Sequence, residues 1–376
     1  MTRSRRSRSS TGRRRWRPWT IIARCEPSVV DGCVFEDLGS SGLVLGDDAT
    51  PAIRDCAVRG ARGNGLPANG RAGGTVERLT VDGTPKPGVA LEEQATARLT
   101  DVRTMGCTTG FHIYSTAQPV LTGCSAVSSI THGVLLSATT APALNNVEAQ
   151  DSGGSGFVAI EQARDTLSDC LAENSLAAGI LVRGNAEPTL QRTLVTGGKA
   201  EGILLDADSV PRFGRVTVHR AAGHGIVLAD GSRARLRDVE IVGAGGHGLH
   251  ARDEARGRIE TTSVVDAAQC GVRVDGASPA FQDVAVRGSG AAGFAAAGKC
   301  APELIDTLIE DSGGDGITVT DDDAGLTAVR ARALRSRGHD ALIGAGSATG
   351  LTECEFTDGK ADGIRIATER PARSAG

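Results

Sequence analysis

Apolar residues recur along this chain in a pattern with a period of 23 residues. A glycine followed by a short apolar segment opens each repeat, and the opening glycines stand 22 or 23 residues apart from Gly42 to Gly316. Nearly the same spacing reaches back to Trp19 and forward to Gly363, with Asp340 in the place of one glycine. About fifteen repeats therefore fill residues 19–376.

Each repeat contains three short segments in which inward and outward positions alternate. If the opening glycine is position 1, these segments lie at positions 2–4, 10–12 and 15–17, and turn-forming Gly, Asp, Asn and Ser residues separate them. Alternation with period two is typical of β-strands, and no amphipathic helix of ten residues fits within a repeat. The pattern predicts an all-β parallel β-helix, a solenoid of about fifteen coils of 23 residues with three short strands per coil.

The positions of the phenylalanines and cysteines agree with this repeat. All seven phenylalanines fall at inward positions, namely Phe35, Phe111, Phe157, Phe213, Phe281, Phe294 and Phe356. Five cysteines share position 15, namely Cys33, Cys56, Cys124, Cys170 and Cys354. Cysteine serves there as a small core hydrophobe. Because the nine cysteines form no CxxC pairs, we expect no disulfide framework and no zinc site, and a reducing cytoplasm fits best.

Repeats such as residues 179–201 and 225–247 resemble the right-handed parallel β-helix repeats of the pectin-lyase-like superfamily. They are also similar to the β-helix arrays of high-GC actinobacterial proteins, which are sometimes joined to an AAA+ ATPase domain. The resemblance covers residues 19–376 and implies a right-handed helix, which spacing alone does not show. This fold hosts lyases, epimerases, hydrolases and non-enzymatic scaffolds, so the resemblance implies no single activity.

Composition and charge exclude several classes of protein. The chain of 376 residues has 51 glycines without a Gly-X-Y period, which excludes collagen. No apolar run approaches the roughly 18 residues of a membrane span, so we expect no membrane partner. The formal net charge is −4, although residues 1–20 carry eight arginines and no acid. We therefore divide the chain into a basic disordered tail, residues 1–18, and a β-helix domain, residues 19–376.

The tail does not have the pattern of an export signal. A twin-arginine signal needs a longer apolar stretch than Ile21-Ile22-Ala23, which Arg24 ends. We expect a solvated tail that holds nucleic acid, if at all, through charge alone. A cytoplasmic location is the resulting prediction.

One motif match disappears once the repeat is recognised. Residues 293–299 match the first seven positions of a P-loop, but Cys300 stands where a Mg²⁺-binding Ser or Thr is needed. The match also begins on an opening glycine and runs along a predicted strand. We therefore expect no nucleotide, no other cofactor and no metal.

The first outward feature is a row of aliphatic residues at position 3. We call it the apolar ridge, and it consists of Leu135, Val158, Leu181, Leu204 and Val227 in five consecutive repeats. Such a row is typical of a docking surface for a protein or a further domain. The alternative is that a turn or the tail covers the row, or that it reflects strand propensity alone.

The second outward feature is basic. Eight arginines gather on one side of successive repeats, namely Arg192, Arg212, Arg215, Arg233, Arg235, Arg237, Arg256 and Arg258. Guanidinium groups bind carboxylates and phosphates, so this set is a candidate polyanion site. Because Asp238, Glu240 and Glu260 are interleaved with the arginines, a solvated face without a ligand is the alternative.

The third feature is a group of histidines. His224 and His247 share position 23 of successive repeats, Glu201 stands one repeat earlier, and His250 follows closely. These residue types are suited to acid–base catalysis. The alternative is a tolerant turn, because position 23 otherwise holds many residue types.

The outward positions favour binding over catalysis. Tyr114 is the single outward aromatic residue expected on the rod, although sugar-processing sites use such rings for stacking. No pair of carboxylates is distinguished by its position. We expect a non-catalytic scaffold that docks a protein partner or a further domain of a larger polypeptide. The alternative is a carbohydrate-active enzyme that holds an acidic polysaccharide on its arginine face.

Overall fold

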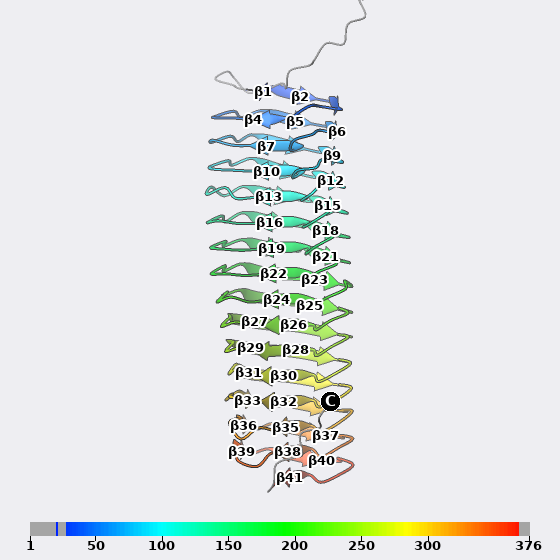
Figure 1. Cartoon of the computed structure of the whole chain (residues 1–376), viewed down its shortest axis with the longest axis vertical. Coiled ribbons are helices and arrows are strands. Elements are labelled where there is room, and N and C mark those ends of the chain that lie inside the picture. Colours follow the sequence, from blue (N-terminus) through cyan, green and yellow to red (C-terminus); the bar gives the residue numbers. More distant parts are fainter. Residues whose placement is uncertain (1–19, 22–27, 368–376) are drawn as a thin grey trace, which may run out of the picture.

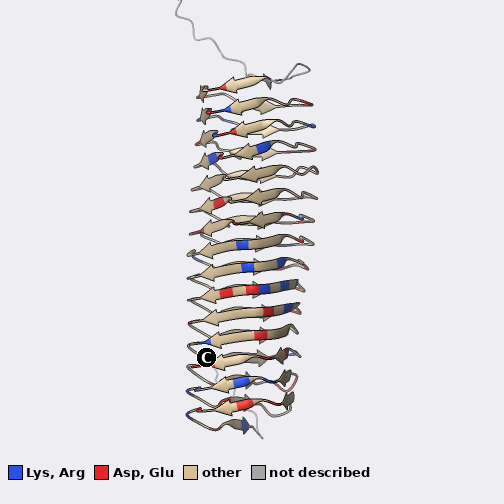
Figure 2. Ribbon diagram, turned by 180° about the vertical axis from the view of Figure 1, so that it is seen from behind, with Lys and Arg blue, Asp and Glu red and all other residues tan. Residues whose placement is uncertain are grey.

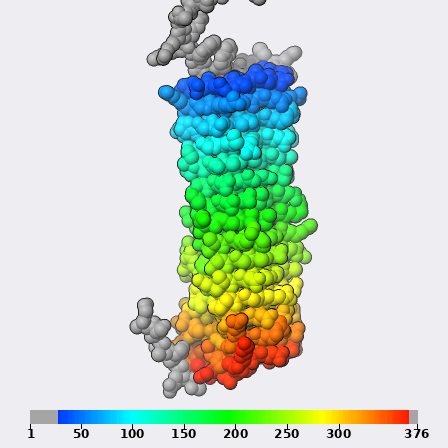
Figure 3. Space-filling model, turned by 90° about the vertical axis from the view of Figure 1, so that its right-hand side faces the viewer, coloured from blue at the N-terminus to red at the C-terminus, as the bar shows by residue number. Residues whose placement is uncertain are grey.

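The computed structural model describes residues 20–21 and 28–367, and all regular structure in this part of the chain is β-strand. The strands form a 16-stranded sheet, here sheet A, and a 25-stranded sheet, here sheet B. Figure 1 shows the coils stacked along the long axis of a rod, and Figure 3 shows that side chains fill this rod without a break between coils. The predicted parallel β-helix is confirmed. The tail at residues 1–18 lies outside the described residues.

Each coil gives one strand to sheet A. The strands of sheet A are β1 (Thr20–Ile21), β4 (Val44–Leu45), β7 (Leu66–Ala68), β10 (Val89–Leu91), β13 (Phe111–Ile113), β16 (Val134–Leu136), β19 (Phe157–Ala159), β22 (Ile180–Val182), β24 (Ile203–Leu205), β26 (Ile226–Leu228), β28 (Leu249–Arg252), β30 (Val272–Asp275), β32 (Phe294–Ala297), β35 (Ile317–Val319), β38 (Ala341–Ile343) and β41 (Ile364–Ile366).

Most coils give two strands to sheet B, and in five coils these two strands are continuous. The strands of sheet B are β2 (Val29–Asp31), β3 (Val34–Glu36), β5 (Ala52–Arg54), β6 (Ala57–Arg59), β8 (Thr75–Glu77), β9 (Thr80–Asp82), β11 (Arg98–Thr100), β12 (Arg103–Met105), β14 (Val120–Thr122), β15 (Ser125–Val127), β17 (Ala143–Asn145), β18 (Glu148–Gln150), β20 (Thr166–Ser168), β21 (Leu171–Glu173), β23 (Thr189–Thr196), β25 (Arg212–His219), β27 (Arg233–Val242), β29 (Arg256–Val265), β31 (Ala280–Arg287), β33 (Glu303–Ile305), β34 (Leu308–Glu310), β36 (Gly325–Val329), β37 (Arg332–Leu334), β39 (Ala348–Thr352) and β40 (Glu355–Thr357).

Neighbouring coils pair in parallel with a register of about one repeat. Val89 of β10 faces Phe111 of β13, and Leu99 of β11 faces Leu121 of β14. The short strands of sheet B begin at positions 11 and 16, one residue later than the alternation predicts. Every coil therefore repeats the same inward and outward positions, and residues of one position form a column along the rod.

The opening glycines are required by close packing between the two sheets. A Cβ atom on Gly202 would lie 2.3 Å from Cγ1 of Val218 and 2.6 Å from the carbonyl oxygen of Gly225. The corners use glycine for a different reason, because position 19 has a positive φ in coil after coil. That position is Gly in some coils and Asp or Asn in others, as at Gly197 (φ 68°) and Asn174 (φ 54°).

The core is one continuous set of stacked aliphatic and aromatic columns. Phe111, Phe157, Phe213, Phe281 and Phe294 are buried, while Phe35 and Phe356 pack against this core from coils near its two ends. The eight cysteines within the described residues are free thiols, and all of them are buried or half-buried. No helix in this part of the chain is long and apolar enough to cross a membrane.

Candidate functional site

The predicted basic face lies where the strands of sheet B are longest. β25 has eight residues, and β27 and β29 have ten residues each. Arg212 faces Arg235 across one strand boundary, and Arg235 faces Arg258 across the next. Arg233 and Arg256 form a second row of register partners beside them. Because adjacent strands are about 4.8 Å apart, these guanidinium stems form a compact grid.

Most of these arginines are exposed without an ionic partner. Among the described residues, no carboxylate lies within ion-pair distance of five of them, namely Arg212, Arg215, Arg233, Arg235 and Arg256. The other three predicted arginines have partners. Arg192 pairs with Asp169, Arg237 lies 4.0 Å from Asp238, and Arg258 bonds to Glu260 and to Gln282.

The grid borders an open groove of about 850 Å³, which we call the arginine groove. Phe213, Ala234 and Leu236 lie beneath it, and their side chains are buried in the core. Its walls include five arginines, namely Arg212, Arg233, Arg235, Arg237 and Arg258. Figure 2 shows basic segments at the beginning of these long strands. The exposed side chains around the groove are mainly basic, which suits a long anionic ligand.

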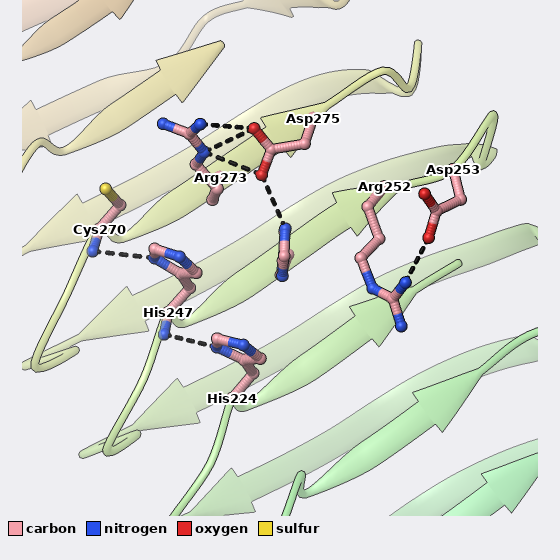
Figure 4. A network of polar contacts seen from close by, with 8 residues as sticks. His224, His247, Arg252, Asp253, Cys270, Arg273 and Asp275 are labelled. Carbon is pink, nitrogen blue, oxygen red and sulfur yellow. Dashed lines mark hydrogen bonds and ion pairs between the residues drawn. The ribbon is translucent and has the colours of Figure 1, made fainter. Parts of the chain in front are cut away.

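The predicted histidines come together on the outer side of sheet A, as Figure 4 shows. The backbone N–H of His247 donates to Nδ1 of His224 at 2.8 Å, and that of Cys270 donates to Nδ1 of His247 at 3.1 Å. Two other position-23 histidines, His132 and His339, accept a backbone N–H of the next coil in the same way. Histidine in this column therefore has a structural role, because it ties one coil to the next.

His250 has different contacts. Its Nε2 lies 2.9 Å from Oδ2 of Asp275 at the end of β30, and Nε of Arg273 donates to the other oxygen of Asp275 at 2.8 Å. The ring centroids of His224 and His247 lie 5.0 and 5.1 Å from that of His250. We call the four residues His224, His247, His250 and Asp275 the histidine cluster.

The electrostatics of the cluster favour neutral rings for His224 and His247 and an ionised carboxylate for Asp275. Burial lowers the pKa of His224, and burial together with the other two histidines lowers the pKa of His247 to about 4. Burial opposes ionisation of Asp275, but hydrogen bonds from His250 and Arg273 outweigh it and hold the pKa of that carboxyl well below its usual range. Glu201 raises the pKa of His224, an effect smaller than that of burial.

The apolar ridge is present but offers little surface. Leu135, Leu181 and Leu204 are half-buried, whereas Val158 is 3% exposed and Val227 is 2% exposed. Adjacent residues of the row lie on paired strands, so each side chain covers part of the next. The ridge is therefore a shallow apolar strip rather than a projecting surface.

Two contacts of the histidine cluster were not predicted. Asp275 and Arg273 stand 25 and 23 residues after His250, so one coil separates them from it. The sequence did contain a signal for the contact with Asp275. This acid lies in the following repeat, two positions beyond the one that His250 occupies. A second polar site was also missed: the single tyrosine, Tyr114, lies 4.7 Å from His112 between ring centroids, and burial together with Glu92 raises the pKa of Tyr114 above its usual range.

Comparison with known families decides the classification. The profile described as "Right handed beta helix region" matches residues 20–147 and 121–260, which is more than half of the chain. The chain belongs to this right-handed β-helix family. The right-handed, pectin-lyase-like fold that the resemblance implied is therefore confirmed, while the link to AAA+ ATPase domains and the cytoplasmic location stay predictions. No curated protein matches this chain in sequence.

Solved structures show the same fold at low sequence identity. A double mutant of the periplasmic alginate epimerase AlgG is 10% identical with a TM-score of 0.55, and the match covers 75% of this chain and 77% of that chain. The Vag8 chain of a complex with C1 inhibitor is 16% identical with a TM-score of 0.53, and the match covers 91% of this chain and 100% of that one. This β-helix protein shares the architecture of both, and these likenesses extend to the fold alone.

Proposed function

We propose that this β-helix protein binds an extended acidic polysaccharide along the arginine groove. The observation that carries the proposal is the set of exposed arginines in three successive coils that have no ionic partner among the described residues, namely Arg212, Arg215, Arg233, Arg235 and Arg256. Like charges held about 4.8 Å apart repel one another, and a polyanion relieves that repulsion. The planar guanidinium matches a carboxylate or sulfate with two parallel hydrogen bonds, which a row of uronate groups supplies repeatedly.

The shape of the groove favours a polysaccharide over a nucleic acid. Single-stranded nucleic acids bind mainly by stacking their bases on exposed aromatic rings. The aromatic residue that lines the groove, Phe213, is 4% exposed, so its ring is not accessible for the stacking of bases.

The groove supports binding rather than catalysis. Glu260 is the acidic residue of its lining, and this carboxylate is already bonded to Arg258. Hydrolysis of a glycosidic bond needs two carboxyl groups in separate roles. We therefore propose the groove as a binding surface for a polymer rather than as a site of glycoside hydrolysis. The buried residues of the apolar ridge make protein docking on that face the weaker alternative.

The test compares two variants that lose the same charge. One is Arg212→Gln/Arg233→Gln/Arg235→Gln in the groove, and the matched control is Arg78→Gln/Arg330→Gln/Arg335→Gln, whose arginines are all paired with acids. Binding of polygalacturonate to the full chain is measured by calorimetry in low and high salt. We expect the groove variant to lose affinity by about tenfold or more, because each charge-assisted contact is worth about 1.5–3 kcal/mol.

The control variant and neutral dextran complete the experiment. The control should keep its affinity within about twofold, because its three arginines lie outside the groove. It has the same net charge as the groove variant, so a difference between the two is not an effect of total charge. Equal losses of affinity in both variants would mean that binding depends only on the total charge of the protein, and this would overturn the proposal. Binding of duplex DNA that is tighter than binding of polygalacturonate would overturn the choice of polymer.

A further inference from the structure

One ring nitrogen of the histidine cluster has no partner. Nδ1 of His250 is buried and makes no hydrogen bond within the described part of the chain. Buried polar atoms in native proteins nearly always have a partner, so this atom needs an explanation. One ring nitrogen from each of His224, His247 and His250 lies within 4.8 Å of the others. The three rings thus border one small space, with His224 and His247 stacked in nearly parallel planes, centroids 4.9 Å apart, and His250 edge-on to both.

The hydrogen bonds define which nitrogen carries the proton in two of these rings. A backbone N–H can only donate, so Nδ1 of His224 and Nδ1 of His247 must each present a lone pair. In a neutral ring the proton then sits on Nε2. Both rings are neutral at pH 7, because burial lowers their pKa values. Each therefore offers one N–H donor at its free nitrogen.

His250 has the opposite character. Its Nε2 faces the ionised carboxylate of Asp275, which can only accept, so Nε2 carries the proton. Nδ1 is then a free lone pair. A proton on this nitrogen as well would bring three N–H groups together with no acceptor among them. The cluster therefore contains two donors and one acceptor.

We infer that the histidine cluster is a proton-accepting site for a hydroxyl group or a water molecule. The O–H of this group donates to Nδ1 of His250, and its oxygen accepts a hydrogen bond from Nε2–H of one of the two stacked rings, His224 or His247. Nitrogens bonded to one oxygen at about 2.9 Å in tetrahedral directions lie about 4.7 Å apart, in agreement with the observed limit.

The same contacts argue against a metal ion in this space. A metal needs the lone pairs of Nε2, which would move the protons of His224 and His247 to Nδ1. Those protons would then face backbone N–H groups, and both bonds between coils would be lost. Zinc also brings its ligands within about 2.1 Å of the ion, so the nitrogens would have to move to about 3.4 Å from one another.

The site has the parts needed to activate an oxygen nucleophile. His250 takes the proton of the O–H group, and Asp275 stabilises the positive ring that results. An N–H donor of His224 or His247 orients the oxygen beside Nδ1 of His250. With an ester, the oxygen forms a bond to the carbonyl carbon, the bond to the alkoxide breaks, and the alkoxide takes the proton from His250. The net reaction with water is ester hydrolysis.

This inference is independent of the proposed polysaccharide binding. His224 and His247 lie in the turns that precede β26 and β28 of sheet A, and His250 and Asp275 lie on β28 and β30, whereas the arginine groove lies on sheet B. No residue of the cluster lines the groove. Failure of one proposal therefore leaves the other unaffected.

The first experiment measures the proton positions directly. Nitrogen-15 NMR of the labelled full chain distinguishes the two neutral forms of each histidine, with signals assigned by His→Gln variants. We expect the proton on Nε2 in His224, His247 and His250 at pH 7. A proton on Nδ1 of His250 overturns the inference. So does stoichiometric Zn²⁺ binding that removes the Nε2–H signals of His224 and His247, because the cluster would then be a metal site.

The second experiment measures proton acceptance with an ester probe. Hydrolysis of p-nitrophenyl acetate is compared in the full chain and in His250→Gln, with Asp275→Asn as an independent variant if the first does not fold. His132→Gln is the matched control, because His132 has the same backbone contact and no carboxylate partner within the described residues. We expect the hydrolysis rate to fall at least about tenfold in both cluster variants and to stay unchanged in the control. Equal rates in all variants overturn the inference.

Discussion

Arginine follows two different patterns along this rod. Outside the groove, an arginine of one coil commonly bonds to an acid of an adjacent coil, as Arg78 does to Asp55 at 2.7 Å and Arg330 to Asp306 at 2.6 Å. In the groove, Arg235 faces Arg212 on one side and Arg258 on the other. The repeat is the same in both regions. What differs is the residue one period away, and that residue decides whether a charge ties two coils together or remains available to a ligand.

The difference is also visible in the acids. Hydrogen bonds from the partner arginines lower the pKa values of Asp55 and Asp306. Arg212, Arg233 and Arg235 of the groove have no such partner among the described residues and are exposed to solvent. Unpaired charge on the outside of a solenoid therefore has a small effect on folding, whereas unpaired charge inside has a large one. Four predictions test this contrast, beginning with the largest effect.

An unpaired charge placed directly beneath the groove should have the largest effect. Leu236 is 1% exposed and lies between the outward Arg235 and Arg237. Leu236→Asp buries a carboxylate without a partner, and we expect a loss of about 3–5 kcal/mol in the free energy of unfolding. Urea unfolding measures it, with Arg237→Asp as the outward control. A loss below 1 kcal/mol in Leu236→Asp would contradict the inward position of this residue.

Asp165 is a buried charge that the chain already contains. Both of its carboxylate oxygens lack a partner within the described residues, and burial raises its pKa well above the usual value. The folded state favours the protonated form, so the stability penalty grows as pH rises above about 3.9. Pro142 and Pro188 occupy the same position in the adjacent coils, and the Asp165 amide donates no bond to another coil in the described backbone.

Asp165→Pro should therefore stabilise the protein by about 1–3 kcal/mol at pH 7. The gain should be smaller at pH 4, because the carboxyl group of Asp165 is then partly protonated in the unfolded chain as well as protonated in the folded protein. Urea unfolding of both proteins at the two pH values gives the difference. A gain that does not change with pH would mean that ionisation of Asp165 is not its cause.

The lowered pKa of His247 should cause a smaller change in the free energy of unfolding at acidic pH. The pKa of His247 in the folded protein is about 4, below the ordinary value of 6.5, so folding favours its neutral form. Its contribution is complete above pH 6.5 and is lost as pH falls from 6.5 towards 4. Because the ring is half-exposed, we expect a contribution below about 1 kcal/mol. His247→Gln should flatten this part of the stability curve, and an unchanged curve would contradict the lowered pKa.

The smallest effects should come from the two arginine variants described above. Removal of the paired arginines should lower the urea midpoint slightly at low salt, because the bonds between coils are lost. Removal of the groove arginines should leave the midpoint unchanged or raise it, since repulsion is relieved. High salt should bring the two variants together. A larger loss in the groove variant would mean that those arginines are structural.

The sequence by itself determined the period, the coil number and the inward columns of the rod. A coil contains three turns and three short strands, and a wrong inward residue would disrupt several coils, so the pattern is written in every repeat. It also placed Arg212, Arg235 and Arg258 in one column, because residues one period apart become register partners. The right-handed sense of the β-helix was predicted from the family resemblance and not from the spacing.

Only the tertiary structure decided the contacts between columns. Asp275 meets His250 diagonally, across one coil and two positions, and no single column contains that pair. Arg212, Arg233 and Arg235 have no carboxylate within ion-pair distance among the described residues, whereas Arg258 bonds to Glu260. Register determines which backbones are about 4.8 Å apart. The direction of each side chain on that backbone depends on all the neighbours it packs against, and these are present together only in the folded rod.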